Sequence, residues 1–131
     1  MYIIIIGCGE VGSRLAKDLS SGKDNVVVID RSRKALKKLG VRFNGRTLRG
    51  DGLDLETLEE AGITSCDVIF VLTGNEDLNL VIGQVAKRMY KVKKVVVQAH
   101  SYYKEEIFKN KELVIVNRTN LFLDKFKQCI S

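Results

Sequence analysis

The chain has 131 residues, a net charge of +6 at pH 7 and three cysteines, with neither proline nor tryptophan. This length predicts one domain, large enough to bury a core without disulfides. Because no apolar run approaches the ~20 residues that cross a bilayer, and no signal-peptide pattern opens the chain, we expect a cytoplasmic protein without direct membrane insertion. The cysteines are far apart and form no CxxC pair, so the sequence suggests neither a disulfide framework nor a zinc site.

Six apolar runs typical of strands alternate with amphipathic segments typical of helices. Most of the runs are continuous in valine and isoleucine, as in parallel strands buried on both faces. In chain order they cover residues 2–6, 26–29, 47–49, 68–72, 95–98 and 113–116. Right-handed crossovers then predict an α/β Rossmann fold, a doubly wound sheet of six mainly parallel strands in the order 3-2-1-4-5-6 with helices on both faces.

A glycine-rich turn follows the first strand and opens the first helix. It reads GxGxxG, with the residues Gly7, Cys8, Gly9, Glu10, Val11 and Gly12. The first glycine permits the tight bend, the second the approach of a pyrophosphate, and the third the packing of helix on strand. A helix beginning near Glu10 presents free N–H groups and its positive dipole end to phosphates. We therefore predict a nucleotide phosphate site here rather than a glycine turn without a ligand.

An acid, Asp30, ends the second strand about 20 residues after the turn, where a carboxylate accepts hydrogen bonds from a ribose diol. The alternative is an N-cap for a helix starting at Arg31, and the two roles can coexist. A 2′-phosphate would be repelled by this carboxylate, although Arg31 beside it softens the repulsion. The sequence therefore favours NAD(H) or an adenine nucleotide (ATP, ADP or AMP) over NADP(H).

Two further strand ends carry polar residues suited to a ligand. Gly50, Asp51 and Gly52 follow the third strand, where the carboxylate can accept from an adenine amino group or serve only as a turn. After the fourth strand, Thr73 and Gly74 precede Asn75, and either Thr73 or Asn75 is a natural N-cap for the next long helix. Asn79, one turn into that helix, is expected either to orient the loop or to face the pocket.

The order of these motifs resembles that of the RCK/KTN (TrkA N-terminal) domains, regulatory parts of prokaryotic potassium channels and of Trk/Ktr-type potassium transporters. The motifs are GCGEVGSRLAKDL, VVVID, GDGLDLETLEEAGI and CDVIFVLTGNEDLNL. The resemblance implies a nucleotide site whose members are Gly7, Gly9, Gly12, Asp30, Arg31, Asp51 and Thr73. It also implies a homodimer or larger ring, bound peripherally at the inner face of the membrane through a potassium channel or transporter subunit.

The chain departs from the pattern of this family in two places. An arginine is common at the end of the fifth strand, where this chain has Gln98, Ala99 and His100. Loss of that cation affects affinity for a highly charged nucleotide. Many relatives also continue into a ligand-sensing RCK-C domain, whereas this sequence stops at Ser131, so we expect a minimal regulator or part of a longer protein.

A small NAD-dependent oxidoreductase, or a cofactor-binding fragment of one, is the alternative function. Tyr90 and Lys94 have a Tyr-x-x-x-Lys spacing, but they fall across a predicted helix end and strand start and would not share a helical face. His100 is the single histidine, and Cys8 occupies a turn that requires a small residue. No catalytic set emerges, and we expect a binding protein rather than an enzyme.

The terminal helix, from about Thr119, carries an apolar stripe. Phe122, Phe126, Cys129 and Ile130 follow the spacing of one helical face. The stripe either packs on its own domain or forms a self-complementary dimer contact. Basic stretches at 31–38, 87–94 and 104–111 read as solvated helix faces, with an anionic membrane surface or nucleic acid as alternatives. Nucleic acid is disfavoured because the chain lacks interleaved aromatics and any known reading motif.

Overall fold

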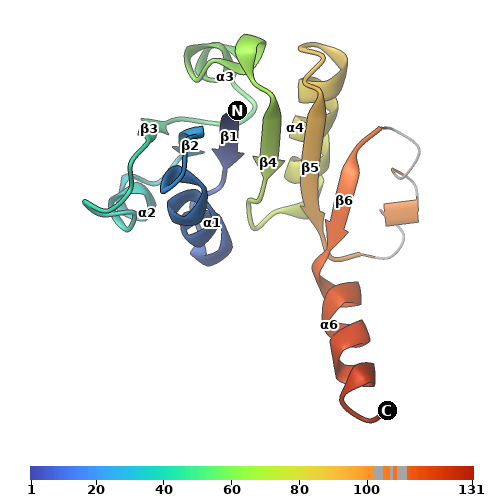
Figure 1. Ribbon diagram of the computed structural model, residues 1–131. Coiled ribbons are helices and arrows are strands. Elements are labelled where there is room, and N and C mark those ends of the chain that lie inside the picture. Colours follow the sequence, from blue (N-terminus) through green and yellow to red (C-terminus); the bar gives the residue numbers. More distant parts are fainter. Residues whose placement is uncertain (102–104, 107, 109–111) are drawn as a thin grey trace.

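Six parallel strands form one sheet in the order β3-β2-β1-β4-β5-β6, as the sequence predicted (Figure 1). The computed structural model describes residues 1–101, 105–106, 108 and 112–131. Every predicted strand is present, with each end shifted by no more than one residue. The strands are β1 (Tyr2–Ile6), β2 (Asn25–Asp30), β3 (Arg46–Arg49), β4 (Val68–Val71), β5 (Lys94–Ala99) and β6 (Val114–Asn117).

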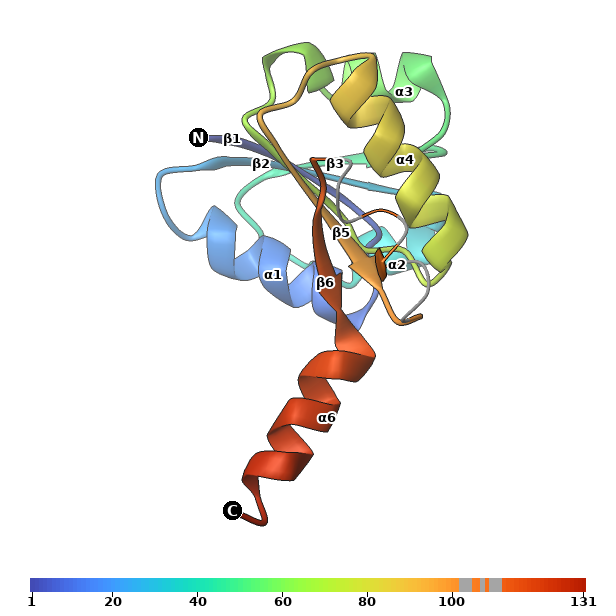
Figure 2. The same ribbon diagram turned by 90° about the vertical axis from the view of Figure 1, so that its right-hand side faces the viewer.

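Helices cover both faces of this sheet because successive side chains of a strand point to opposite sides. On β1, Ile3 and Ile5 pack with α1 (Glu10–Ser20) and α2 (Arg33–Lys37). Ile4 and Ile6 belong to the opposite cluster with α3 (Leu55–Glu60) and α4 (Glu76–Arg88). Figure 2 shows α1 and α4 on opposite sides of the sheet. Burying each isoleucine contributes about 1.5–3 kcal/mol to the stability of the fold. Because β1 has isoleucines in both clusters, it stabilises the packing of helices on both faces of the sheet.

The short connections place four loops at one edge of the sheet. In a parallel sheet the carboxyl ends of all strands lie at the same edge. The β1–α1 and β2–α2 connections open there beside the β3–α3 and β4–α4 connections, and a 3-10 turn (Ile63–Ser65) leads from α3 into β4. Polar residues at these loops are thereby brought together from distant parts of the sequence.

The last helix, α6 (Arg118–Gln128), projects away from the sheet and its covering helices (Figures 1 and 2). It buries none of its residues against the described part of the chain. Phe122 is 56% exposed and Phe126 is 68% exposed, so the first of the two alternatives for this stripe, packing on its own domain, is not found among the described residues. Among the described helices, none has the length and apolar character needed to cross a membrane.

Candidate functional site

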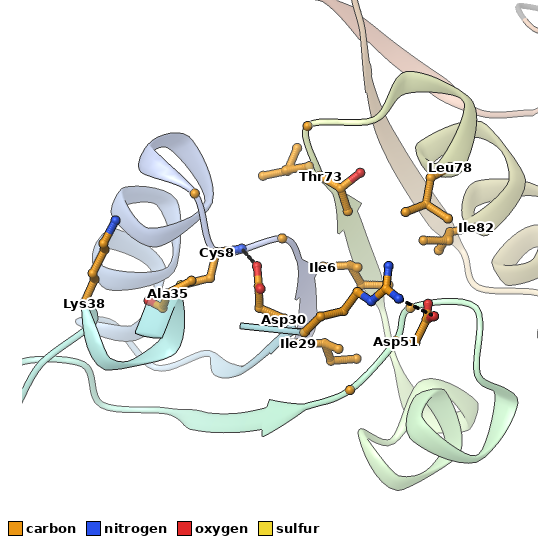
Figure 3. Close-up of a pocket in the computed structure, with 17 residues that line it drawn as sticks. Ile6, Cys8, Ile29, Asp30, Ala35, Lys38, Asp51, Thr73, Leu78 and Ile82 are labelled. Atoms are coloured by element: carbon orange, nitrogen blue, oxygen red, sulfur yellow. Dashed lines mark hydrogen bonds and ion pairs between the residues drawn. The ribbon is translucent and has the colours of Figure 1, made fainter. Parts of the chain in front are cut away.

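A cleft of about 310 Å³ opens at the carboxyl ends of β1 to β4, between the loops that follow these strands (Figure 3). It lies where the strand order reverses between β1 and β4. This is the place where doubly wound sheets bind ligands. Of the residues predicted for a nucleotide site, those that line the cleft are Gly7, Cys8, Gly9, Asp30, Arg31, Asp51, Gly52, Thr73 and Gly74.

The glycine turn is packed so tightly that side chains are excluded at two of its positions. Gly7 has φ +106°, and a Cβ there would lie 2.7 Å from the carbonyl carbon of Leu72. A Cβ on Gly12 would overlap the carbonyl oxygen of Gly7, so the first turn of α1 sits directly on the loop. By contrast, nothing lies within 4 Å of a Cβ built on Gly9, which faces open space at the cleft.

Helix α1 begins at Glu10, as predicted, and its N-terminus lacks a side-chain cap. Its N-cap is Gly9, which has no side chain to accept from the first N–H groups. The caps of the other described α-helices do accept such a bond, and these caps are Ser32, Asp54, Asn75 and Asn117. The donors and positive dipole end of an eleven-residue helix are thus open to an anion at the cleft.

Asp30 fixes the glycine turn to the second strand. Its Oδ2 accepts from the Cys8 N–H at 2.7 Å (Figure 3). Its Oδ1 accepts from the Ser32 N–H, also at 2.7 Å. Each carboxylate oxygen has a further lone pair for a ligand hydroxyl. The alternative role as an N-cap for a helix starting at Arg31 is wrong, because α2 begins at Arg33 and is capped by Ser32.

An exposed ion pair crosses from the second loop to the third. Arg31 Nη2 lies 3.7 Å from Asp51 Oδ2, and the Arg31 side chain is mostly exposed while that of Asp51 is half-buried. The other oxygen of Asp51 accepts from the Leu53 N–H at 2.9 Å. Asp51 therefore stabilises a turn, which is one of the two roles that the sequence indicates for it. A Cβ on Gly52 would lie 2.8 Å from Ile82 Cδ1, so this loop packs closely on the wall of the cleft.

Asn79 orients the loop after β4 instead of facing the cleft. It is 1% exposed, its Oδ1 accepts from the Thr73 N–H at 3.0 Å, and its Nδ2 donates to the carbonyls of Thr73 and Gln98. The Thr73 hydroxyl also contacts Asn79 Oδ1. Asn75, not Thr73, caps α4. Glu10, Val11, Gly12, Asn75 and Asn79 therefore surround the cleft without lining it.

The walls of the cleft include apolar residues that sequence reasoning missed. Ile6 and Ile29 come from strand ends, while Leu78 and Ile82 come from one face of α4 (Figure 3). They occupy ordinary core positions, and only the fold shows that the cleft opens beside them. The remaining unpredicted lining residues are Ala35, Lys38 and Leu72, while Gly50 belongs to the predicted loop after the third strand. Lys38 belongs to a stretch that was read as a solvated face.

The nucleophilic and acidic groups near the cleft have structural partners. Cys8 Sγ donates to the Ala35 carbonyl, and burial together with the Asp30 charge raises the pKa of the Cys8 thiol. Buried Glu76 accepts from the N–H groups of His100 and Ser101 at 2.8 and 2.6 Å. Glu76 thus anchors the segment that follows β5.

The described cleft combines three features that suit a nucleoside phosphate. An uncapped helix N-terminus attracts a phosphate, the Asp30 carboxylate can accept from a ligand hydroxyl, and apolar walls suit a base. The ionisable lining residues are two acids, Asp30 and Asp51, two bases, Arg31 and Lys38, and the Cys8 thiol.

Solved structures of low sequence identity share this fold. The TrkA-N domain of the Escherichia coli inner membrane protein ybaL has a TM-score of 0.88 and 18% identity, over 99% of this chain and 96% of that one. The GsuK channel bound to NAD has a TM-score of 0.80 and 20% identity, over 96% of this chain and 22% of the channel chain. The Shewanella denitrificans Kef CTD in AMP-bound form has a TM-score of 0.75 and 20% identity, over 98% and 82%.

Curated relatives are similar over most of this sequence. The Trk system potassium uptake protein TrkA of Streptomyces coelicolor is 35% identical over 108 residues, which are 82% of this chain and 48% of the relative. The TrkA homolog of Methanothermobacter thermautotrophicus is 34% identical over 109 residues, 83% of this chain and 50% of the relative. The chain thus spans about half the length of these proteins. The profile of the TrkA-N domain family matches residues 3–117. The chain belongs to the TrkA-N domain family.

Proposed function

We propose that this domain binds NAD(H) or an adenine nucleotide and regulates a potassium channel or potassium uptake transporter. The observation that carries the proposal is the cleft in which the open N-terminus of α1 and the Asp30 carboxylate share one apolar-walled space. The predicted ligand-contacting residues are the turn from Gly7 to Gly12, Asp30 and Arg31, and the loops at Asp51–Gly52 and Thr73–Gly74, with Asn75 and Asn79 in support.

The common part of the candidate ligands is adenosine with a 5′-phosphate. The phosphate would lie at the N-terminus of α1, the ribose hydroxyls would donate to Asp30, and the base would lie between the apolar wall and Asp51. Similar folds bind NAD in GsuK and AMP in the Kef domain, which supports this range of ligands. NADP(H) is expected to bind more weakly because its 2′-phosphate would meet the Asp30 carboxylate.

A binding domain regulates a partner only if the ligand favours one of two shapes. We infer that nucleotide changes the arrangement of paired domains in a dimer or ring, which acts on a membrane potassium protein at the inner face of the membrane. The exposed stripe on α6 supports an assembly of this kind. The relatives that are potassium uptake proteins support the choice of partner.

The proposal assigns no catalytic residue to this chain. Among the described residues, Tyr90 follows the end of α4 and Lys94 begins β5, so the pair does not share a helical face. The Cys8 thiol stays protonated at neutral pH because its pKa is raised. A spectrophotometric assay of NADH oxidation with small carbonyl substrates tests the oxidoreductase alternative, and we expect no turnover.

Calorimetric titration with NADH, NAD⁺, ATP, ADP and AMP tests the binding step. We expect saturable binding of at least one of these nucleotides and weaker binding of NADP⁺ than of NAD⁺. Absence of binding by all five would overturn the proposal. Potassium uptake in cells that lack the chain tests the regulatory step. We expect altered uptake that the wild-type gene restores, and unchanged uptake would contradict the regulatory role.

A further inference from the structure

One segment supplies the whole positive excess of the chain. The chain has a net charge of +6, yet residues 31–49 contain eight lysines and arginines and no aspartate or glutamate. The rest of the chain therefore carries a net negative charge. We call this segment the basic edge, and its cations are Arg31, Arg33, Lys34, Lys37, Lys38, Arg42, Arg46 and Arg49.

The basic edge forms one border of the molecule. It comprises α2, the following loop and β3, which is the edge strand next to β2 (Figure 1). All eight cations are exposed. Arg46 donates to the Glu60 carbonyl at 2.9 Å and Arg49 to the Arg31 carbonyl at 3.2 Å, so these two bonds do not neutralise either charge. Arg46 reaches toward α3 and Arg31 lies 3.7 Å from Asp51, so the other six cations of the edge form its strongly positive part.

An apolar tip stands among these cations. Val41, in the loop between α2 and β3, is 102% exposed and is followed directly by Arg42. A shallow groove of about 530 Å³ lies beside it, with Leu36, Leu39 and Phe43 among its lining residues together with cations of the edge. A protruding apolar residue surrounded by lysine and arginine suits the boundary between lipid headgroups and acyl chains, where apolar burial and anionic attraction add together.

Nucleic acid fits this surface less well than an anionic bilayer does. Phe43 is the single aromatic residue between positions 31 and 49, and it packs against the core beneath α1 and α2. One half-buried ring does not provide the series of aromatic platforms on which successive bases stack. The fully exposed Val41 would also find no apolar contact on a phosphate backbone, whereas it can enter a layer of lipid headgroups.

We propose that the basic edge binds the surface of an anionic lipid bilayer, with Val41 reaching into the headgroup region and the surrounding cations contacting lipid phosphates. The contact is peripheral and electrostatic. Its centre, formed by Lys34, Lys37, Val41 and Arg42, lies outside the nucleotide cleft, whereas Arg31 and Lys38 of the same edge line the cleft. The domain would thereby be held with α2 and β3 against the membrane.

Vesicle flotation tests this contact. Vesicles of phosphatidylglycerol and phosphatidylcholine should carry the protein, whereas vesicles of phosphatidylcholine alone should not. Binding should vanish when salt is raised from about 0.1 M to about 1 M, since the screening length falls from roughly 10 Å to roughly 3 Å. Equal binding to both vesicle types, or no binding to either, would overturn the proposal.

Matched triple variants separate position from net charge. In the edge variant, Lys34→Gln, Lys37→Gln and Arg42→Gln remove three exposed cations, and each cation near an anionic surface changes partitioning roughly fivefold. We expect partitioning to fall about 100-fold. The control variant carries Lys23→Gln, Arg88→Gln and Lys93→Gln, which remove three exposed cations elsewhere with the same change in net charge. Equal losses in the two variants would contradict a localised contact.

A unique fluorophore locates the contact without removing charge. The chain contains no tryptophan, so Val41→Trp reports on the tip alone and Met89→Trp, at a residue that is 57% exposed on another surface, serves as control. Anionic vesicles should shift the emission of the first variant to shorter wavelength and leave the second unchanged. No shift at position 41 would overturn the proposal, as would a shift caused by duplex DNA or poly-glutamate but not by vesicles.

Discussion

Replacing Asp30 by asparagine tests whether the ribose of a nucleotide donates to this side chain. The carboxylate accepts the Cys8 and Ser32 N–H groups, each at 2.7 Å, and has lone pairs left for a ligand hydroxyl. A hydrogen bond to a charged acceptor contributes about 1.5–3 kcal/mol. Because Asp30 is only half-buried, water can replace a missing donor, and we take the lower limit, which corresponds to roughly tenfold in affinity.

The assay compares AMP with 2′-deoxy-AMP by calorimetry on the wild type and on Asp30→Asn. The wild type should prefer AMP by about tenfold, and the variant should lose most of that preference. The amide keeps one acceptor oxygen but turns its NH₂ toward a main-chain N–H, so unfolding free energy should fall by about 1–2 kcal/mol without loss of the fold.

The ratio of the two affinities isolates ribose recognition from the role of Asp30 in holding the glycine turn, since a distorted turn weakens both ligands alike. Asp18→Asn, an exposed change on α1 away from the cleft, should preserve the preference. If Asp30→Asn retained the full preference for AMP, the placement of the ribose at this carboxylate would be refuted.

Three further substitutions or conditions give distinct outcomes. Gly12→Ala should destabilise the fold by about 3 kcal/mol or more in urea denaturation, because its Cβ overlaps the glycine-turn carbonyl; Gly74→Ala, with open space around its Cβ, should change stability by less than about 1 kcal/mol. Asn79→Ala should cost about 2–4 kcal/mol in the same measurement, since buried main-chain groups lose partners, and a near-neutral result would contradict its role in the loop. Burial raises the pKa of Cys66 from 9.0 to about 11. The thiol therefore ionises first in the unfolded state, and the contribution of Cys66 to stability should decline as pH rises from about 9 to about 11. Thiol labelling near neutral pH should modify exposed Cys129 well before buried Cys66, and equal labelling rates would contradict this burial.

The order of strands could be predicted from the sequence because parallel sheets have few permitted topologies. Continuous runs such as Ile3 to Ile6 indicated strands buried on both faces, and right-handed crossovers left one sensible arrangement. The position of Gly12 also followed from sequence, because a GxGxxG turn between a strand and a helix requires close packing. The structure identifies the atom that a side chain at position 12 would meet, which is the carbonyl oxygen of Gly7.

Side-chain orientation could not be predicted in the same way. Thr73, Asn75 and Asn79 were all plausible near a ligand, yet Asn75 caps α4 and Asn79 is buried behind the loop. Their roles depend on how α4 is oriented where it packs on the sheet, which the spacing of residues in the sequence does not specify. Leu78 and Ile82 have the pattern of core residues, and their position on the cleft wall depends on the space left between loops.

The basic edge shows the same limit. In the sequence, the stretch from Arg31 to Lys38 has the pattern of a solvated helix face, and nothing in the sequence links it to the basic residues that follow. The fold places α2 beside β3 at the border of the sheet and so joins this run to Arg42, Arg46 and Arg49. Charges that are spread along the sequence therefore meet at one border of the molecule.

The central claim is that a nucleotide phosphate binds at the open N-terminus of α1, beside Asp30. Amide chemical shifts of the labelled protein during titration with AMP test it most directly. We expect large, saturable shifts at Gly9, Glu10 and Arg31 and small shifts along β6. Saturable shifts confined to other parts of the chain, with these amides unmoved, would contradict it.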